Sequence, residues 1–279
     1  MPETAPGTVV IAVGDELLHG FTLDSNSHWI AQRVREAGFP AVRIEVVGDS
    51  REAIVDAVGR AVADRRATRV LVCGGLGPTP DDRTLEALAT ALGRPLARDG
   101  RAEAHVQDIV ARMHAAGWVA SAQLSDANRR MTVVPAGATV LENRRGMAPG
   151  LAYPLPDPGD PHQPPPAPAH ASAAESAARW LIALPGVPRE LQALLTEEVL
   201  PRFFSGGELR HVGELRYRHA IEAELYEPLL TLEREFPEVA FGSYPQTETR
   251  ELIIRAHGVD AAQVAAALDR LAELRPLVG

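Results

Sequence analysis

The sequence predicts an α/β protein: a three-layer α/β/α domain with a mostly parallel sheet, followed by a small α+β domain. First, short apolar runs typical of buried strands alternate with helical patterns up to about residue 204. Second, a glycine-rich turn separates one of these strands from the next helix, an arrangement that favours phosphate binding. Third, Pro201 and Ser205–Gly207 interrupt the pattern before a new set of strands and helices begins.

Composition limits the function classes. The 279 residues, 46% of them hydrophobic, are enough for one large domain and a small one. A membrane partner is not expected, because no apolar run approaches the roughly 20 residues that cross a bilayer. The single cysteine, Cys73, is expected to be a buried core residue and is compatible with the cytoplasm. A net charge of −9 argues against nucleic-acid binding, and the absence of lysine excludes a lysine nucleophile or a P-loop lysine.

The first two strands are expected at Val9–Val13 and Val42–Val47, which are short runs rich in β-branched residues. Asp24–Ser27 offers N-caps for the helix between them, and Gly38 ends that helix. Ser50 is expected to cap the next helix, whose apolar stripe consists of Ile54, Val55, Val58, Ala61 and Val62.

The third strand ends at Cys73 and leads into the glycine turn. Gly74, Gly75 and Gly77 permit positive φ and close approach of a ligand. Asp81 or Asp82 is expected to cap the following helix, which Gly93 ends. In a doubly wound sheet the first and third strands are commonly neighbours, and ligands bind beyond their carboxyl ends. The loop 14–20 is therefore expected to lie beside the glycine turn.

The remainder of the large domain is less regular. We expect a helix over 102–116, a capped run over 121–128, a strand over 132–134 and a loop over 143–150. The Pro- and Ala-rich stretch 154–178 is expected to be a mobile hairpin loop, because it has too few large apolar residues to pack and an apolar strand, 180–184, resumes after it. Pro185–Pro188 then turns the chain into a helix that extends through Val199.

The domain boundary is expected between residues 204 and 205. In 205–279 we expect a strand over 209–219, a helix over 222–236, strands over 239–243 and 251–257, and a helix over 261–274. This βαββα order describes a small α+β layer.

Five carboxylates follow the first three strands: Asp15, Glu16, Asp49, Asp81 and Asp82. Each alone is equally explained as a helix cap or turn residue. Together they would repel a phosphate on the glycine turn, and a divalent cation with oxygen ligands would remove that conflict. Such an ion also supplies what pyrophosphate hydrolysis requires. Thr79 and Thr84 offer hydroxyls to a phosphate, although caps are an equal alternative.

An ordered set of motifs resembles the CinA family (competence/damage-inducible protein A), whose N-terminal domain belongs to the molybdopterin-binding superfamily. The matching segments are 14–20, 24–26, 47–49, 74–79, 81–82 with Thr84, 92–96, 128–129, 135–138, Asn143, 146–150 and 184–190. The second domain resembles the family's small KH-type module, chiefly through Phe241–Pro245. Two departures are the absence of the family's C-terminal amidase domain and Asp15 in place of the usual threonine.

The resemblance implies a homodimer and a nucleotide pyrophosphatase that cleaves ADP-ribose-like substrates to AMP and a sugar phosphate, with Co²⁺, Mn²⁺ or Mg²⁺. The expected catalytic residues are Asp81, Asp82 and Glu16. Metal ligands are expected among Glu16, Asp49, Asp81 and Asp82. Substrate and phosphate are expected to contact Gly14, Asp15, Asn26, Gly74, Gly75, Gly77, Thr79, Thr84 and Gly186.

Two alternatives remain open. The same pocket would serve molybdopterin binding or adenylyl transfer in molybdenum-cofactor synthesis. A non-catalytic module that senses nucleotides or supports assembly is the other alternative. RNA binding is not expected, because the small domain lacks the GxxG loop and its surroundings are acidic.

Overall fold

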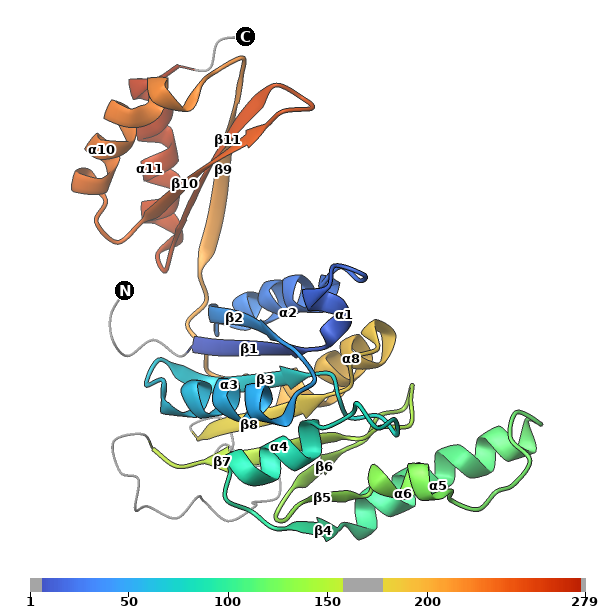
Figure 1. Ribbon diagram of the computed structural model, residues 1–279. Helices are drawn as coiled ribbons and strands as arrows, with labels where there is room; N and C mark the ends of the chain where they lie inside the picture. The colour runs from blue at the N-terminus through green and yellow to red at the C-terminus, as the bar shows by residue number, and fades with distance from the viewer. Residues whose placement is uncertain (1–6, 158–177, 277–279) are drawn as a thin grey trace. The chain divides into compact units, whose positions relative to one another are not determined.

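The computed structural model describes residues 7–157 and 178–276. The chain divides into two compact units, one up to Gly207 and the other from Glu208 (Figure 1). The division falls three residues beyond the expected boundary at 204/205. Most of the stretch expected to be a mobile loop, residues 158–177, lies outside the described residues.

A six-stranded sheet in the order β2-β1-β3-β8-β7-β6 forms the centre of the larger unit. Its strands are β1 (Gly7–Val13), β2 (Ala41–Val47), β3 (Ala67–Cys73), β6 (Thr139–Leu141), β7 (Gly150–Leu155) and β8 (Arg179–Leu184). Strands β2, β1, β3 and β8 are parallel, and β7 and β6 are antiparallel additions. The mostly parallel α/β fold expected from the sequence is confirmed, as is the adjacency of the first and third strands.

Alternation along the central strands places apolar side chains on both faces of the sheet. In β3, Val70 and Val72 belong to one hydrophobic cluster, while Leu71 and Cys73 belong to the other. All four are buried, as the apolar sequence of a central parallel strand predicts. Burial also raises the pKa of the Cys73 thiol, so Cys73 is a core residue as expected.

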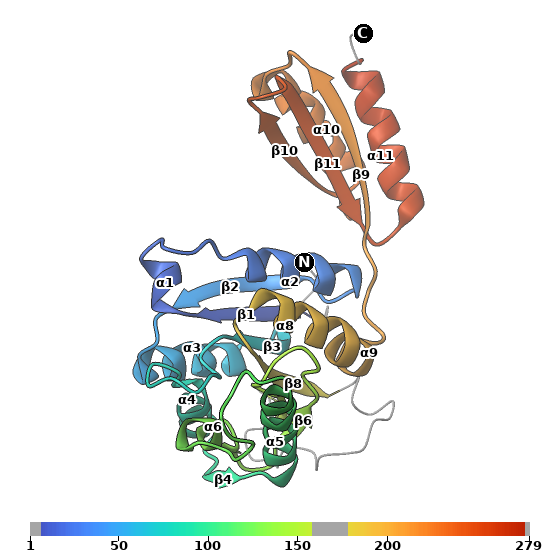
Figure 2. The same ribbon diagram turned by 90° about the vertical axis from the view of Figure 1, so that its right-hand side faces the viewer.

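Helices cover both faces and complete three layers. One cluster is covered by α3 (Arg51–Ala63), α4 (Thr84–Ala91) and α5 (Gly100–Ala115); α3 and α4 lie side by side (Figure 2). The other is covered by α2 (Ser25–Glu36), α8 (Pro188–Leu194), a π-helical segment (Leu195–Val199) and α9 (Leu200–Phe203). The remaining elements are α1 (Asp15–Leu18), α6 (Asp126–Arg130) and the pair β4 (Leu96–Arg98) and β5 (Val133–Pro135).

Three local expectations were wrong. The segment after β1 contains the short helix α1 instead of an open loop. Neither Asp81 nor Asp82 caps α4, whose N-cap residue is Arg83. Residues 154–155, expected in the loop, belong to β7 and are buried, because β7 pairs with both β6 and β8 within the core of the larger unit. The antiparallel pairing of β7 with β8 does confirm that the intervening segment connects a hairpin.

The smaller unit follows the expected βαββα order. Strands β9 (His211–Arg218), β10 (Ala240–Gln246) and β11 (Glu251–Gly258) form an antiparallel sheet in the order β10-β11-β9. A 3-10 turn (Glu222–Leu225), α10 (Tyr226–Glu235) and α11 (Ala261–Leu274) contribute to its core with Leu225, Leu232 and Leu271 (Figure 1). Across the described residues of both units, no helix is long and apolar enough to span a membrane.

Candidate functional site

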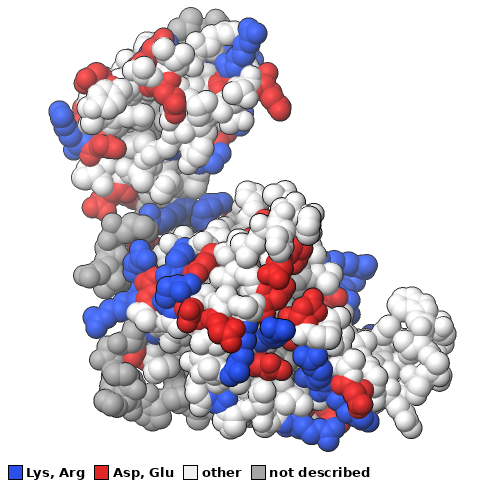
Figure 3. Space-filling view, in the orientation of Figure 1, with Lys and Arg blue, Asp and Glu red and all other residues white. Residues whose placement is uncertain are grey.

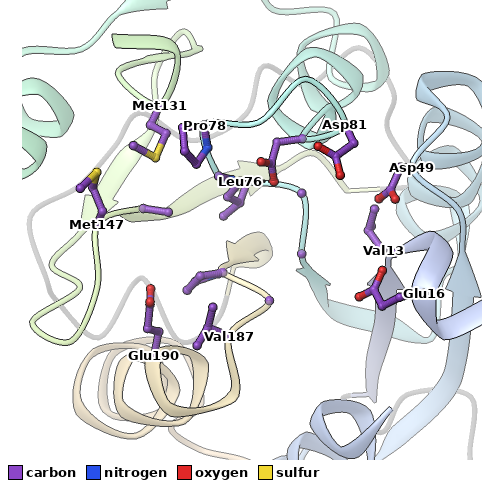
Figure 4. Close-up of a pocket in the computed structure, with 18 of the residues that line it drawn as sticks. Val13, Glu16, Asp49, Leu76, Pro78, Asp81, Met131, Met147, Val187 and Glu190 are labelled. Carbon is purple, nitrogen blue, oxygen red and sulfur yellow. Dashed lines mark hydrogen bonds between the residues drawn. The ribbon is translucent and has the colours of Figure 1, made fainter. Parts of the chain in front are cut away.

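A pocket of about 520 Å³ lies at the carboxyl ends of the central parallel strands. The residues after β1, β3 and β8 form its walls, including Gly14, the glycine turn and Pro185–Pro188. Figure 4 shows Glu16, Asp49 and Asp81 on one side of the pocket and Met131 and Met147 on the opposite side. The expectation that the loop 14–20 lies beside the glycine turn is therefore confirmed, and Pro185–Pro188 joins them.

The glycine turn requires glycine at two positions. Gly74 has a φ of 108° and Gly75 a φ of 66°, both in the left-handed region. A side chain at Gly74 would collide with the Val13 carbonyl oxygen, and one at Gly75 would collide with the Thr84 hydroxyl. The amides of Gly75 and Leu76 donate no hydrogen bond to any described residue. Two consecutive free N–H groups in such a turn form a small anion-binding concavity.

Asp82 holds this turn in shape. Its Oδ1 accepts a hydrogen bond from the Gly77 amide at 2.8 Å, and its Oδ2 accepts from the Thr79 amide at 2.8 Å and the Thr79 hydroxyl at 2.5 Å. Thr84 acts from the other side, because its buried hydroxyl donates to the Gly74 carbonyl at 2.8 Å. Neither threonine lines the pocket, and both hydroxyl groups donate within the turn; their contact with phosphate stays a prediction.

Asp81 remains exposed to solvent beside the turn. The Thr79 side chain and the backbone amide of Asp81 itself hold the pKa of the Asp81 carboxyl below its usual range. Asp81 is therefore ionised near neutral pH, with oxygens directed at the pocket (Figure 4).

The β1 and β2 side of the pocket carries two further carboxylates. Glu16 folds back over Gly14, where a Cβ atom would lie 2.5 Å from both carboxylate oxygens. Asp15 and Asp49 hold each other: the Asp15 amide donates to Asp49 Oδ2 at 3.0 Å, and the Asp49 amide donates to Asp15 Oδ1 at 3.2 Å. Asp15 itself does not line the pocket, and its two hydrogen bonds fix the position of Asp49.

All four expected metal ligands, Glu16, Asp49, Asp81 and Asp82, line this pocket. Even so, no group of three or more His, Cys, Asp or Glu side chains in residues 7–157 and 178–276 is arranged to hold a metal ion alone. Both carboxylate oxygens of Asp82 accept hydrogen bonds from the turn, whereas the carboxylates of Glu16 and Asp81 are available to a ligand. This donor set fits a hard cation such as Mg²⁺, which proteins commonly bind through one or two carboxylates together with substrate phosphates and water.

The turn after β8 completes the pocket. Gly186 lies so close to the glycine turn that a Cβ atom there would be 3.3 Å from the Gly74 Cα atom. Asn26 on α2 donates from Nδ2 to the Gly186 carbonyl oxygen at 2.7 Å. Asn26 is therefore a support for this wall and is not among the pocket-lining residues.

Sequence reasoning assigned no chemical role to Glu190, Met131 or Met147, which also line the pocket. Glu190 belongs to α8 and lies against Gly146. A side chain at position 146 would collide with the Glu190 carboxylate. Its Oε2 accepts a hydrogen bond from the buried Asn143 Nδ2 at 2.8 Å. The motifs Asn143, 146–150 and 184–190 include Asn143, Met147 and Glu190, but only the fold shows that they meet, and Met131 lies outside every motif.

Charged side chains of both signs are mixed over the larger unit on the face shown in Figure 3. This pattern gives no continuous basic stripe on that face of the kind that binds a nucleic-acid backbone.

Comparisons with known proteins agree with the fold. Residues 9–204 match the family model described as "Probable molybdopterin binding domain". Residues 214–277 match the model of the FAD synthase middle domain, which replaces the expected KH-type assignment of the smaller unit.

Individual relatives are similar over much of the chain. A Pyrococcus horikoshii protein is 36% identical over 227 residues, covering 81% of this chain and 79% of that protein. A CinA-like protein of Gemmatimonas aurantiaca is 30% identical over 95% of this chain, which spans 56% of that relative. The solved structure of CinA from Thermoplasma acidophilum matches with a TM-score of 0.55 and 30% identity, covering 69% of this chain and 95% of that one.

Proposed function

Because the chain belongs to the CinA family, with a molybdopterin-binding domain as its larger unit, we propose that it hydrolyses the pyrophosphate bond of ADP-ribose-like nucleotides. The products are AMP and a sugar phosphate, and a divalent cation, Co²⁺, Mn²⁺ or Mg²⁺, is required. One observation carries this proposal: the two free amides of Gly75 and Leu76 lie in the same pocket as Glu16 and Asp81.

The role of each residue follows from which of its polar groups is available to the substrate. The amides of Gly75 and Leu76 bind phosphoryl oxygens, and Asp82 keeps those amides in position through Gly77 and Thr79. When bound, the cation polarises a phosphoryl oxygen and offsets the negative charge of the carboxylates. Glu16 and Asp81 are the candidates to hold that cation and to accept a proton from the attacking water.

The test incubates the full chain with ADP-ribose and each of the three cations and measures AMP. We expect AMP with at least one cation, none with EDTA, and about a 100-fold loss of kcat/KM in Glu16→Gln and Asp81→Asn. Glu52→Gln is the matched control, because Glu52 is exposed in the first turn of α3 and outside the pocket. The absence of AMP with all three cations would refute the proposal.

The smaller unit's match to an FAD synthase domain makes FAD a second substrate to include, since FAD also contains AMP joined through a pyrophosphate. Molybdopterin binding is the enzymatic alternative, favoured by the family description of residues 9–204. Calorimetry that showed tight molybdopterin binding without turnover of either dinucleotide would support that alternative. Metal-independent nucleotide binding without product would instead indicate a non-catalytic module.

A further inference from the structure

A second cavity adjoins the candidate site. It has a volume of about 490 Å³ and lies between α5 and residues 144–147. We refer to it as the Arg–Trp pocket, after Arg112, Arg144, Arg145 and Trp118, which line it. Met147 lines both this cavity and the candidate site, so the two cavities are neighbours on the Met147 side, away from Glu16 and Asp49 (Figure 4).

The Arg–Trp pocket has an excess of positive charge in a chain of net charge −9. Arg112 is paired with Asp108 at 3.0 Å, and Arg144 is paired with Glu142 at 3.3 Å. The Arg145 guanidinium makes no hydrogen bond or ion pair with any residue that the structure describes. Of the three guanidinium groups, Arg145 is therefore the one whose donors are available to an anionic ligand.

The aromatic wall of the pocket is also available. Trp118 is 77% exposed, and its indole makes no ring contact within the described part of the chain. Beside it lie Met113 and Met147, whose flexible thioethers adapt to a planar partner. An exposed indole next to a guanidinium is a common platform on which a nucleobase stacks, with a π-face above and a cation nearby.

The loop that carries Arg145 is fastened to the candidate site. The buried Asn143 accepts a hydrogen bond on Oδ1 from the Arg145 amide at 3.1 Å. Through Nδ2 it donates to the Ala148 carbonyl and to Glu190 Oε2, both at 2.8 Å. Because Glu190 lines the candidate site, the backbone of Arg145 is held in a fixed relation to that site.

We propose that the Arg–Trp pocket binds the nucleoside end of the substrate, with the base against Trp118 and a phosphate ester of its ribose facing Arg145. The inference rests on the proposed function, since it assumes that the pyrophosphate occupies the adjoining site. The preferred substrates are dinucleotides whose nucleoside ribose carries a further phosphate. A volume of about 490 Å³ is in the range of pockets that hold ligands of nucleoside size.

The first test measures binding to the full chain without metal, using adenosine 2′,5′-bisphosphate as the probe and tryptophan fluorescence and calorimetry as readouts. We expect quenching of Trp118, loss of that signal in Trp118→Phe, and about tenfold weaker binding in Arg145→Gln. Arg145→Lys, which retains the charge, should recover part of the affinity. Arg101→Gln is the matched control, because Arg101 is likewise an exposed arginine of the larger unit but does not line the Arg–Trp pocket.

Adenosine and inorganic phosphate, titrated separately, should each bind more weakly than the bisphosphate. Unchanged affinity in both Arg145→Gln and Trp118→Phe would overturn the proposal. Equal weakening in Arg101→Gln would also overturn it, because the effect would then reflect only the loss of one positive charge from the larger unit.

The second test compares hydrolysis of ADP-ribose with that of 2′-phospho-ADP-ribose. We expect the phosphorylated substrate to have the higher kcat/KM. Arg145→Gln should abolish the difference by raising the KM for the phosphorylated substrate. Hydrolysis of both substrates with equal efficiency in wild type and variant would refute substrate binding in the Arg–Trp pocket but would still support the proposed function. Binding with the expected variant pattern but no hydrolysis of any dinucleotide would refute the proposed function alone.

Discussion

At the scale of single residues, the neighbours Asp81 and Asp82 have opposite roles. Asp82 accepts three hydrogen bonds from the glycine turn, whereas Asp81 is exposed and its carboxylate is available to a ligand. Local preference alone does not separate them, because both are good capping residues and both follow the same turn. Only the geometry of the turn shows which carboxylate is engaged.

Asp82→Asn is expected to destabilise the larger unit by about 1–3 kcal/mol, because the amide nitrogen of asparagine cannot accept a hydrogen bond from a backbone N–H group. At about 2–4 °C per kcal/mol, the melting temperature should fall by several degrees. Asp81→Asn should lose activity with an unchanged melting temperature. Differential scanning calorimetry of both variants checks this contrast, and equal melting temperatures would contradict it.

His105 on α5 makes stability depend on pH. Burial lowers the pKa of the His105 imidazole, against opposing contributions from the Gly146 backbone and from Glu142 and Asp108, while Arg112 lowers it further. The unfolded chain, with an ordinary pKa of 6.5 at this histidine, takes up the proton first as pH falls. Stability is therefore retained above pH 6.5 and decreases below it.

We expect His105→Gln to reduce the fall in melting temperature between about pH 7.5 and pH 5.5. Thermal unfolding followed by circular dichroism at both pH values gives the comparison. His114→Gln, on the exposed outer part of α5, is the control and should retain the wild-type fall. A fall of wild-type size in His105→Gln would show that other groups cause the acid sensitivity.

At the scale of secondary-structure elements, the sequence predicts the parallel strands and most helices well, because β1, β3 and β8 are apolar runs with clear boundaries. The sequence does not predict β7, since its proline and glycine resemble a loop and its burial depends on pairing with β6 and β8 inside the helix-covered core. The candidate site likewise has parts that the sequence predicts and parts that only the fold brings together. The glycine turn and carboxylates follow predictable strand ends, whereas Glu190 and Met147 meet only because β7 places residues 143–147 against α8.

The β7–β8 hairpin gives an element-scale prediction. Leu155 and Arg179 are antiparallel partners, so the described ends of the hairpin are adjacent and a short turn can join them. Replacing 158–177 by such a turn should leave the melting temperature within a few degrees of wild type. Replacing 154–178 should lower it substantially, because that change removes Pro154 and the buried Leu155 from β7. Similar melting temperatures for the two variants would contradict the prediction.

At the scale of the whole molecule, we propose that the protein is a homodimer. Phe21 is 82% exposed and Leu23 is 87% exposed, and large apolar side chains gathered on a surface commonly mark an interface. Light scattering after size exclusion should give twice the mass of one chain, and the double variant Phe21→Ser, Leu23→Ser should give a monomer. A monomeric wild-type protein over the accessible concentration range would contradict the proposal.

The position of β8 beside β3 also determines the order in which the larger unit can fold. Leu71 pairs with Ile182, more than a hundred residues later in the chain. Until β8 arrives during synthesis, one edge of β3 is unpaired, and the glycine turn lacks the wall formed by Gly186 and Glu190. Closing so long a loop is slow, and an open edge of an apolar strand is prone to pair with other chains. The candidate pocket therefore cannot be complete before β8 and α8 have been synthesised, and until then the β8-facing edge of β3 is open to other chains.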